Sequence, residues 1–350
     1  MSTALASPQL TPSMTRGKGV WAAAATRFKT DHVGMSSLVI VVVFLLVVLA
    51  AGLGLVAKDW QVERGVPDAP PTFVGAAAKT ESIAVAAPTG PNVDISAVDP
   101  LAPRYAEWAE AAKKYQTKDS IRADTLPFGG DRLGRDVLAK AIKGAQVSIL
   151  VGVSAAVLAT IIGTLLGAVA GFFGGKVGDL LEWVYNVFTA IPGILLIFAF
   201  AAVFGRGIGS VVLILGLAGW TGIYRLVRAE FIKHANRDYV RSAEAIGASN
   251  ASRMFRHILP NVSHVVLVQL SIHVVGFIKS EVILSYLGLG VGVDQVSWGT
   301  MLSEAQSELI LGHWWQLAAA TIFMAVFVTA FSLMTDALRD ALDPKLRGLE

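Results

Sequence analysis

Lys279 and Glu281 are the only two residues with a full charge in an otherwise apolar stretch, residues 262–287. A charged side chain is costly inside a lipid bilayer, and it often marks the path of a solute, ion or proton. This pair could therefore take part in ion or proton transfer, or could line a pore. The structural alternative is that Lys279 extends its amine to the membrane surface while Glu281 is paired inside a helical bundle. The residues alone leave both roles equally open.

Motifs for covalent, metal-dependent and phosphate chemistry are missing from the sequence. It contains no G-x-x-x-x-G-K-[ST], no H-E-x-x-H and no G-x-S-x-G. It has no cysteine, and its six histidines are scattered. We therefore expect no catalytic residue, no metal site and no cofactor bound by this chain. The energy for any driven work would come from a partner or from an ion gradient.

The composition is that of a membrane protein. Of the 350 residues, 54% are hydrophobic and only 16% are charged, whereas soluble domains carry about 25% charged residues. The net charge of +3 is small, and no basic cluster is interleaved with aromatic residues, so we expect no binding to nucleic acid.

Six apolar stretches approach the length of about 20 residues that a membrane span needs. They are residues 36–57, 145–173, 183–204, 208–224, 262–287 and 314–334. The first could instead be a cleaved signal peptide, but the apolar region of such a peptide is usually shorter, about 7–15 residues. We therefore predict an all-α polytopic membrane protein with six transmembrane helices, the first of them retained.

The distribution of Lys and Arg predicts the orientation in the membrane. Residues 1–35 contain four basic residues and one acidic residue, and residues 225–261 contain seven basic and three acidic residues. Basic loops face the cytoplasm, so we expect a cytoplasmic N-terminal tail (1–35), loop (225–261) and C-terminal tail (339–350). Residues 58–143 would be periplasmic, with a linker at 66–103 and a short amphipathic helix at 105–118.

The sequence also predicts where three further sets of residues lie. Gly163, Gly167 and Gly171 are spaced four apart, so they share one helix face that another helix can approach closely. Trp298, Trp314 and Trp315 are expected at the outer membrane interface, with stacking on a substrate as the alternative. Asp131, Arg135 and Asp136 are expected to form a structural ion-pair cluster at the outer side, or else to contact a binding protein.

The basic loop 225–261 is predicted to form a helix–turn–helix at the membrane surface. Asn236 would cap a helix at 237–246, and Gly247 would supply a turn. Ser249 or Asn250 would cap a second helix at 251–257. Pro260 would then end this helix, and the chain would turn into the fifth span.

The order of residues in this loop resembles the conserved loop of the membrane subunits of ABC importers. That pattern is E-A-A, three residues, Gly, nine residues, Ile, any residue, Leu-Pro. Here Gly247 is followed by nine residues and then by H-I-L-P, in which Leu259 and Pro260 match the pattern and His257 stands where the pattern has Ile. Arg241 and Ser242 depart from the first two positions of the pattern, and Ala243 matches the third.

Other segments resemble the dipeptide, oligopeptide and nickel branch of these permeases, and its C-type subunit in particular. They are G-G-D-R-L-G-R-D at 129–136, the glycine-rich run to A-I-P at 167–192, L-S-Y-L-G-L-G at 284–290, S-W-G at 297–299 and L-R-D-A-L-D-P at 338–344. The resemblance covers residues 125–347 and the first span. It does not extend to the insert at 60–120.

This resemblance implies a type I-like ABC importer permease fold, with a permease core at 144–338 and a cytoplasmic coupling helix. It implies a heteromeric complex in the bacterial inner membrane with a B-type permease, two cytoplasmic ATPases that bind ATP and Mg, and a solute-binding protein. The solute would be a peptide or a similar small molecule. The residues implied to dock on the ATPase are Arg241, Ser242, Ala243, Glu244, Ala245, Ile246, Gly247, Ala248, Ser249 and Asn250.

Two other classes of function remain as alternatives. An ion-driven secondary transporter would need acidic residues near the middle of the membrane, and Glu281 is the one candidate. A membrane scaffold or receptor that does not transport would leave the G-R-D, S-W-G and H-I-L-P-N segments without a role.

Overall fold

The computed structural model describes residues 20–76, 98–114 and 122–342, and the regular elements in these residues are all helical. The elements are α1 (Val20–Thr30), α2 (His32–Gly52), a 3₁₀ turn (Ala102–Arg104), α3 (Tyr105–Lys114), α4 (Val137–Phe173), α5 (Gly175–Ala190), α6 (Gly193–Phe204), α7 (Ile208–Gly219), α8 (Thr221–Ala235), α9 (Asp238–Ala245), α10 (Asn250–Ser252), a π-helical stretch (Arg253–Ile258), α11 (Leu259–Tyr286), α12 (Trp298–Ile310) and α13 (Trp315–Leu342).

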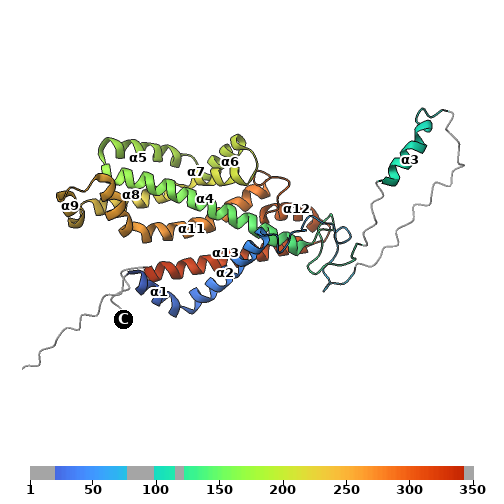
Figure 1. Cartoon of the computed structure of the whole chain (residues 1–350), viewed down its shortest axis with the longest axis horizontal. Coiled ribbons are helices and arrows are strands. Elements are labelled where there is room, and N and C mark those ends of the chain that lie inside the picture. Colours follow the sequence, from blue (N-terminus) through green and yellow to red (C-terminus); the bar gives the residue numbers. More distant parts are fainter. Residues whose placement is uncertain (1–19, 77–97, 115–121, 343–350) are drawn as a thin grey trace, which may run out of the picture.

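The bundle is organised around α4, as Figure 1 shows. Helices α7, α8 and α11 pack along α4, and α2 packs along α13 and α4. We call the two ends of the bundle the α9 end, where α1 and α9 lie, and the α12 end. Four helices are long and apolar enough to cross a membrane, and the number rises to six if each of two bent pairs is one span. The prediction of an all-α polytopic protein is confirmed.

The predicted third span, 183–204, is not one straight helix. It falls on α5 and α6, which are bent by 91° at the break between them. Ile191 adopts an extended conformation and Pro192 is the N-cap of α6. Proline disfavours helix in the residue before it, which explains a break that the apolar composition hides.

The fourth span continues beyond residue 224, where the prediction 208–224 placed its end. Helix α7 is followed directly by α8, which continues to Ala235 with a bend of 43° between the two helices. Residues 225–235 are therefore helical, and the predicted loop 225–261 begins in practice at Asn236.

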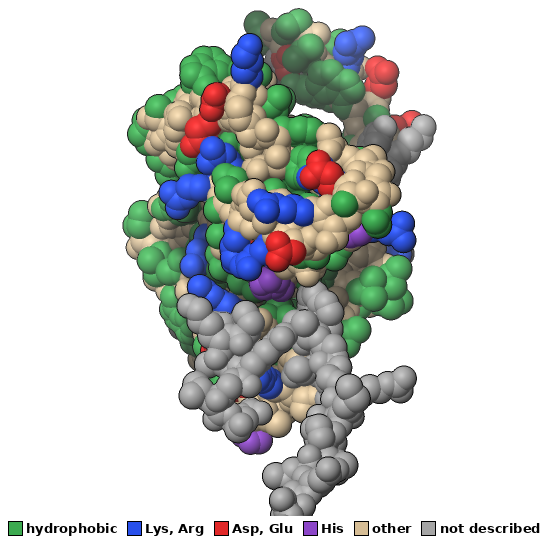
Figure 2. Space-filling view, turned by 90° about the vertical axis from the view of Figure 1, so that its left-hand side faces the viewer, with side chains coloured by type: hydrophobic (Ala, Val, Ile, Leu, Met, Phe, Trp, Pro, Cys, Tyr) green, Lys and Arg blue, Asp and Glu red, His purple; other side chains and the backbone are tan. Residues whose placement is uncertain are grey.

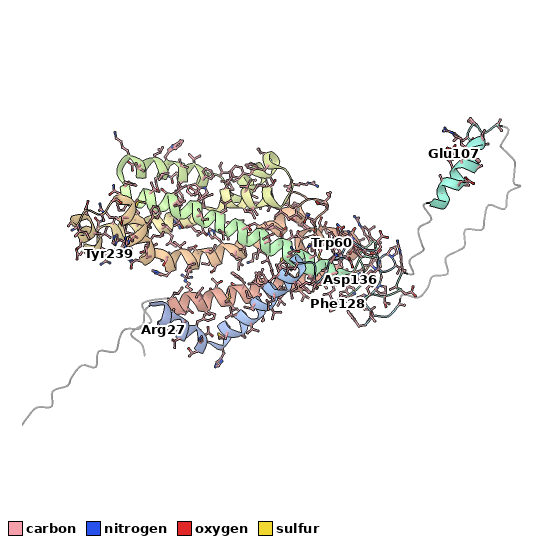
Figure 3. The ribbon with its side chains drawn as sticks, viewed as in Figure 1. Arg27, Trp60, Glu107, Phe128, Asp136 and Tyr239 are labelled. Atoms are coloured by element: carbon pink, nitrogen blue, oxygen red, sulfur yellow. The ribbon has the colours of Figure 1, made fainter. Side chains whose placement is uncertain are left out.

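The boundaries of the segment 58–143 also differ from the prediction. Helix α4 begins at Val137 rather than at 145, because the side chain of Asp136 accepts hydrogen bonds from the backbone N–H groups of Leu138 and Ala139 and caps the helix. Residues 63–71 pair with 123–135 through isolated bridges, so part of the predicted linker is structured. Figure 3 shows Trp60, Phe128 and Asp136 together at the α12 end.

The predicted helix at 105–118 is found as α3. Several predicted segments fall partly outside the described residues. These are the linker between 77 and 97, the end of the predicted helix from 115, the N-terminal tail up to 19 and the C-terminal tail from 343.

The glycine stripe packs as predicted. A methyl group on Gly163, Gly167 or Gly171 would lie 2.6 Å from a backbone carbonyl oxygen of the segment 220–228. Helices α4 and α8 can approach this closely only because these positions have no side chain.

Candidate functional site

Helix α9 lies across the end of the bundle and is fixed to it by its apolar face. Val240 and Ala243 are buried, and Val240 belongs to a core cluster with Phe231, Met254 and Ile258. The core therefore connects α9 to α8 and to the π-helical stretch. Figure 3 labels Tyr239 on this helix, at the opposite end of the bundle from Asp136.

Most of the predicted docking residues are exposed at this end. Ala243 is buried, Ala248 is half-buried, and the other eight residues between 241 and 250 are exposed. Ile246 stands out because 84% of it is exposed, although it is a large hydrophobic residue. The tight turn therefore presents one large apolar side chain among the exposed polar residues of this segment.

The turn at Gly247 has the geometry of a Schellman motif. The N–H of Ala248 donates to the carbonyl of Ala243 at 3.0 Å, and the N–H of Gly247 donates to the carbonyl of Glu244 at 2.9 Å. Gly247 has a φ of +86°, a left-handed conformation that favours glycine. Ser249 then caps the next helix by accepting a hydrogen bond from the N–H of Ser252. The predictions for Gly247 and Ser249 are confirmed.

An ion pair holds the predicted docking surface, residues 241–250, to the bundle. Two nitrogens of Arg253 donate to the two carboxylate oxygens of Glu244 at 2.8 and 2.9 Å. The guanidinium of Arg253 also lies over the ring of Phe172, 5.2 Å from its centroid. These contacts connect α9 to the C-terminal end of α4 and to the start of the helical run that becomes α11.

Two local predictions for this loop are wrong. Asn236 does not cap α9; it ends α8, and its side chain donates to the carbonyl of Ile232. Pro260 does not turn the chain, because the helical run continues from Asn250 to Tyr286. Proline lacks an N–H and clashes with the preceding turn of an α-helix, and the π-helical stretch just before it accommodates this proline.

Glu281 lies near the far end of this run and is fully buried, whereas Lys279 is exposed. The hydroxyl of Ser285 donates to Oε1 of Glu281 at 2.6 Å, and the hydroxyls of Ser148 and Ser297 lie beside the same carboxyl group. Oε2 of Glu281 has no hydrogen-bond partner among the described residues. Lys279 and Glu281 therefore do not act as a pair, and Glu281 connects α11 with α4 and the start of α12.

A second buried polar cluster surrounds Lys140 at the α12 end. Nζ of Lys140 contacts Asp131 at 2.7 Å, Glu304 at 2.5 Å and Gln316 at 3.0 Å. Arg135 also donates to Asp131 at 2.6 Å. The predicted ion-pair cluster is thus present, with Asp136 acting as a helix cap.

The electrostatics of this cluster act in opposite directions on two carboxyl groups. Burial alone would raise the pKa of Asp131, but the charge of Lys140 and the hydrogen bonds from Lys140 and Arg135 hold this pKa below its usual value. Burial raises the pKa of Glu308 to about 7, although its Oε1 accepts a hydrogen bond from the N–H of Arg132.

The prediction that three tryptophans lie at the membrane interface is wrong for two of them. Trp298 is fully buried and donates to the carbonyl of Ala141, and Trp315 is 7% exposed and donates to the carbonyl of Gly130. Both indole N–H groups find a partner inside the protein, which allows these side chains to be buried. Trp314 is exposed.

The structure separates the predicted site residues into two regions. The predicted docking surface lies at the α9 end and Glu281 lies towards the α12 end, and the helical run Asn250–Tyr286 joins them. Sequence reasoning missed Lys140, Glu304 and Gln316. The one available signal was Lys140, an isolated cation close to the G-R-D motif and the start of a long apolar stretch.

Comparison with known proteins is consistent with this geometry. A family model described as the binding-protein-dependent transport system inner membrane component matches residues 163–348, more than half of the chain. The chain is 36% identical over 236 residues to the dipeptide transport system permease protein DppC of Bacillus subtilis (strain 168), which covers 66% of this chain and 74% of that protein. It is 35% identical over 238 residues to the oligopeptide transport system permease protein OppC of the same strain, covering 67% and 78%. It is 39% identical over 222 residues to the glutathione transport system permease protein GsiD of Escherichia coli O157:H7, covering 63% and 73%.

Proposed function

Since the chain belongs to the family of binding-protein-dependent transport system inner membrane components and is a transmembrane ABC permease, we propose that it forms half of the pore of an ATP-driven importer. A B-type permease completes the pore. Two ATPases dock on the cytoplasmic side and hydrolyse ATP with Mg, and a solute-binding protein delivers the solute. The α9 end faces the cytoplasm, in agreement with the excess of basic residues there.

The observation that carries this proposal is the exposed tip of the docking surface. Ile246 offers an apolar contact, and Arg241, Glu244 and Asn250 around it offer charged and polar contacts. This combination of an apolar anchor with a polar rim suits a groove on another protein. Arg241 replaces the acidic residue that is usual in the family, so the ATPase would present an acidic or neutral group at that point.

Movement of α9 is transmitted to the other end of the bundle through one helical run. Arg253 and Val240 fix α9 to the first turns of the run, and Glu281 lies near its last turns. When two ATPases close on ATP, the docked surfaces move with them, and the run shifts relative to α4. This is rigid-body switching between two packed arrangements.

The proposed solute is a peptide or a similar small molecule. The relatives named above are permeases for dipeptides, oligopeptides and glutathione. All three contain peptide bonds and free carboxylates. The binding protein selects among such solutes.

The decisive experiment is uptake by the complete complex reconstituted in vesicles, with Gly247→Val in this chain. Valine at a φ of +86° is strained by about 1–2 kcal/mol, so the turn that presents Ile246 would change shape. We expect uptake to fall at least tenfold while ATP hydrolysis continues and the subunit stays in the membrane. Gly209→Ala is the matched control, because its new methyl group would have no atom within 4 Å and its φ is ordinary for any residue. Unchanged uptake by Gly247→Val, or uptake by the chain driven by an ion gradient without ATPases, would contradict the proposal.

A further inference from the structure

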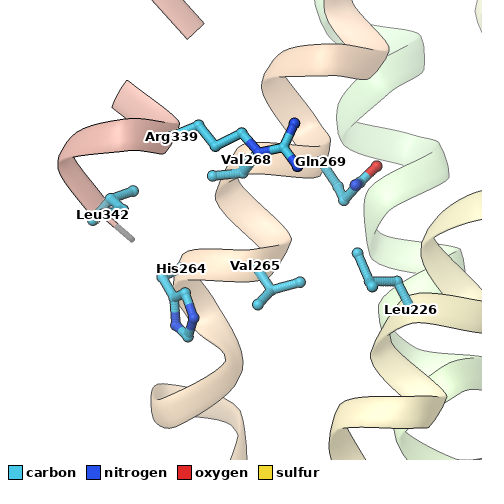
Figure 4. A pocket seen from close by; sticks show the side chains of 7 residues that line it. All are labelled: Leu226, His264, Val265, Val268, Gln269, Arg339 and Leu342. Carbon is cyan, nitrogen blue, oxygen red and sulfur yellow. The ribbon is translucent and has the colours of Figure 1, made fainter. Parts of the chain in front are cut away.

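A recess with a cationic lining opens between three helices at the α9 end (Figure 4). Its volume is about 290 Å³, and α8, α11 and α13 form its walls. Its polar groups are Arg339, His264 and Gln269. Arg339 is exposed and forms no ion pair with any residue that the structure describes, so its guanidinium is available to a ligand.

A second recess of about 290 Å³ lies between α1, α2 and α13 and is almost entirely apolar. Ala25, Phe28, Leu38 and Leu338 contribute to its walls, and the exposed Lys29 also lines it. A space of this kind fits part of a hydrocarbon chain.

The two recesses are neighbours. Leu342 lines both of them. It packs in a small core cluster with Phe28 and Leu338, which line the apolar recess, and with Val268, which lines the cationic one. Among the described residues, no Asp or Glu lines either recess. Figure 2 looks onto this end of the molecule and shows Lys and Arg side chains spread over it.

We propose that these two recesses together form a binding site for an anionic phospholipid. The phosphate contacts Arg339, with His264 and Gln269 as further hydrogen-bond partners, and the start of one acyl chain enters the apolar recess beside Lys29. The rest of the chain lies along α2, whose exposed side chains are apolar at Val39, Val43 and Leu46. Basic pockets between transmembrane helices on the cytoplasmic side are suited to acidic lipid headgroups. The site is separate from the docking surface and from transport of the solute.

The test uses the complete complex in nanodiscs, with binding of a fluorescent phosphatidylglycerol measured without ATP or solute. Arg339→Gln is expected to weaken phosphatidylglycerol binding about tenfold, because it removes the charge-assisted contact with phosphate, and to reduce the preference for phosphatidylglycerol over zwitterionic phosphatidylcholine. Ala25→Trp fills the apolar recess and is expected to weaken binding of the long-chain lipid at least fivefold, but not binding of glycerol 3-phosphate. Lys176→Gln is the matched control, an exposed cation that lines neither recess, and should change binding less than twofold.

Three results would overturn the proposal. The first is an Arg339→Gln variant that binds phosphatidylglycerol as the parent does. The second is an Ala25→Trp variant with unchanged lipid binding. If glycerol 3-phosphate then binds as tightly as the lipid, the site is one for free phosphate. The third is competition by a dipeptide at the same site, which would assign Arg339 to the solute. Because no step depends on ATP or uptake, these results are independent of whether the proposed importer function holds.

Discussion

Glu304 and Glu308 lie one helical turn apart on α12, yet their surroundings differ. Glu304 forms an ion pair with Lys140 at 2.5 Å and remains partly exposed. Glu308 is 2% exposed, and its Oε2 has no hydrogen-bond partner among the described residues. An ionised carboxylate in such a place is poorly solvated, and this explains why the pKa of Glu308 rises to about 7 although the charge of Lys140 acts to lower it.

The stability of the α12 end is therefore expected to fall as the pH rises. The folded state binds the proton of Glu308 up to a pKa of about 7, whereas the ordinary value is 4.5. The stabilisation is complete below pH 4.5 and is lost as the pH rises from 4.5 to above 7. Glu308→Gln should remove this slope and stabilise the protein at pH 8 by at most about 3 kcal/mol, since one pKa unit corresponds to about 1.4 kcal/mol. Thermal melting in detergent across this pH range measures the effect.

Glu304→Gln is the control for this experiment. It weakens the contact with buried Lys140 and should lower the melting temperature. If Glu308→Gln melts with the same dependence on pH as the parent, the titration belongs to another group.

At the scale of residues, the sequence predicts only those contacts of the α12 end whose partners are close in sequence. Asp131, Arg135 and Asp136 are close in sequence, so their contacts could be anticipated from spacing. Lys140 and Glu304 are 164 positions apart, and nothing local brings them together. Likewise, the burial of Trp298 depends on a carbonyl 157 positions away, so an interfacial location was the reasonable expectation.

At the scale of the elements, the close approach of α4 and α8 depends on glycines, which have no side chain. Gly167→Ala would place a methyl group 2.6 Å from the carbonyl oxygen of Tyr224, and the backbone atom cannot move aside as a flexible side chain can. We expect a loss of about 1–3 kcal/mol, as for overpacked cores, measured as a lower melting temperature. Gly209→Ala in α7 should be neutral or slightly stabilising, because alanine is the better helix former. Equal melting temperatures for both variants would mean that α4 and α8 can separate at little cost.

Hydropathy predicts where helices run along the chain but not where they bend. The apolar stretch 183–204 hides the break at Pro192, and the stretch from 208 hides the bend between α7 and α8. Proline has two outcomes here: Pro192 follows a break, and Pro260 lies inside a continuing run. The difference depends on the π-helical stretch before Pro260, whose altered backbone hydrogen bonds accommodate the proline. Residue types alone do not predict such a stretch.

For the whole molecule, we expect the two ends of the bundle to have separable roles. Trp298 is fully buried at the α12 end, where it packs near Phe327. Trp298→Ala should destabilise this end by about 3–5 kcal/mol and reduce uptake, while the ATPases still co-purify with the chain. Trp314→Ala removes an exposed side chain and is expected to keep both properties. Loss of the ATPases from Trp298→Ala would show that the two ends are not independent.

The order of motifs along the chain predicts the family and the docking surface, because both depend on short local patterns. The two recesses at the α9 end could not be predicted. Their linings combine residues from α1, α2, α8, α11 and α13, so they exist only once these helices have packed.

The unbroken run from Asn250 to Tyr286 also constrains how this chain can change in length. Each residue added to an α-helix turns everything beyond it by about 100°. One insertion or deletion between Val262 and Ile278 would therefore rotate Glu281 away from Ser148 while α9 kept its place. The number of residues between α9 and Glu281 is therefore fixed by the phase of this helical run.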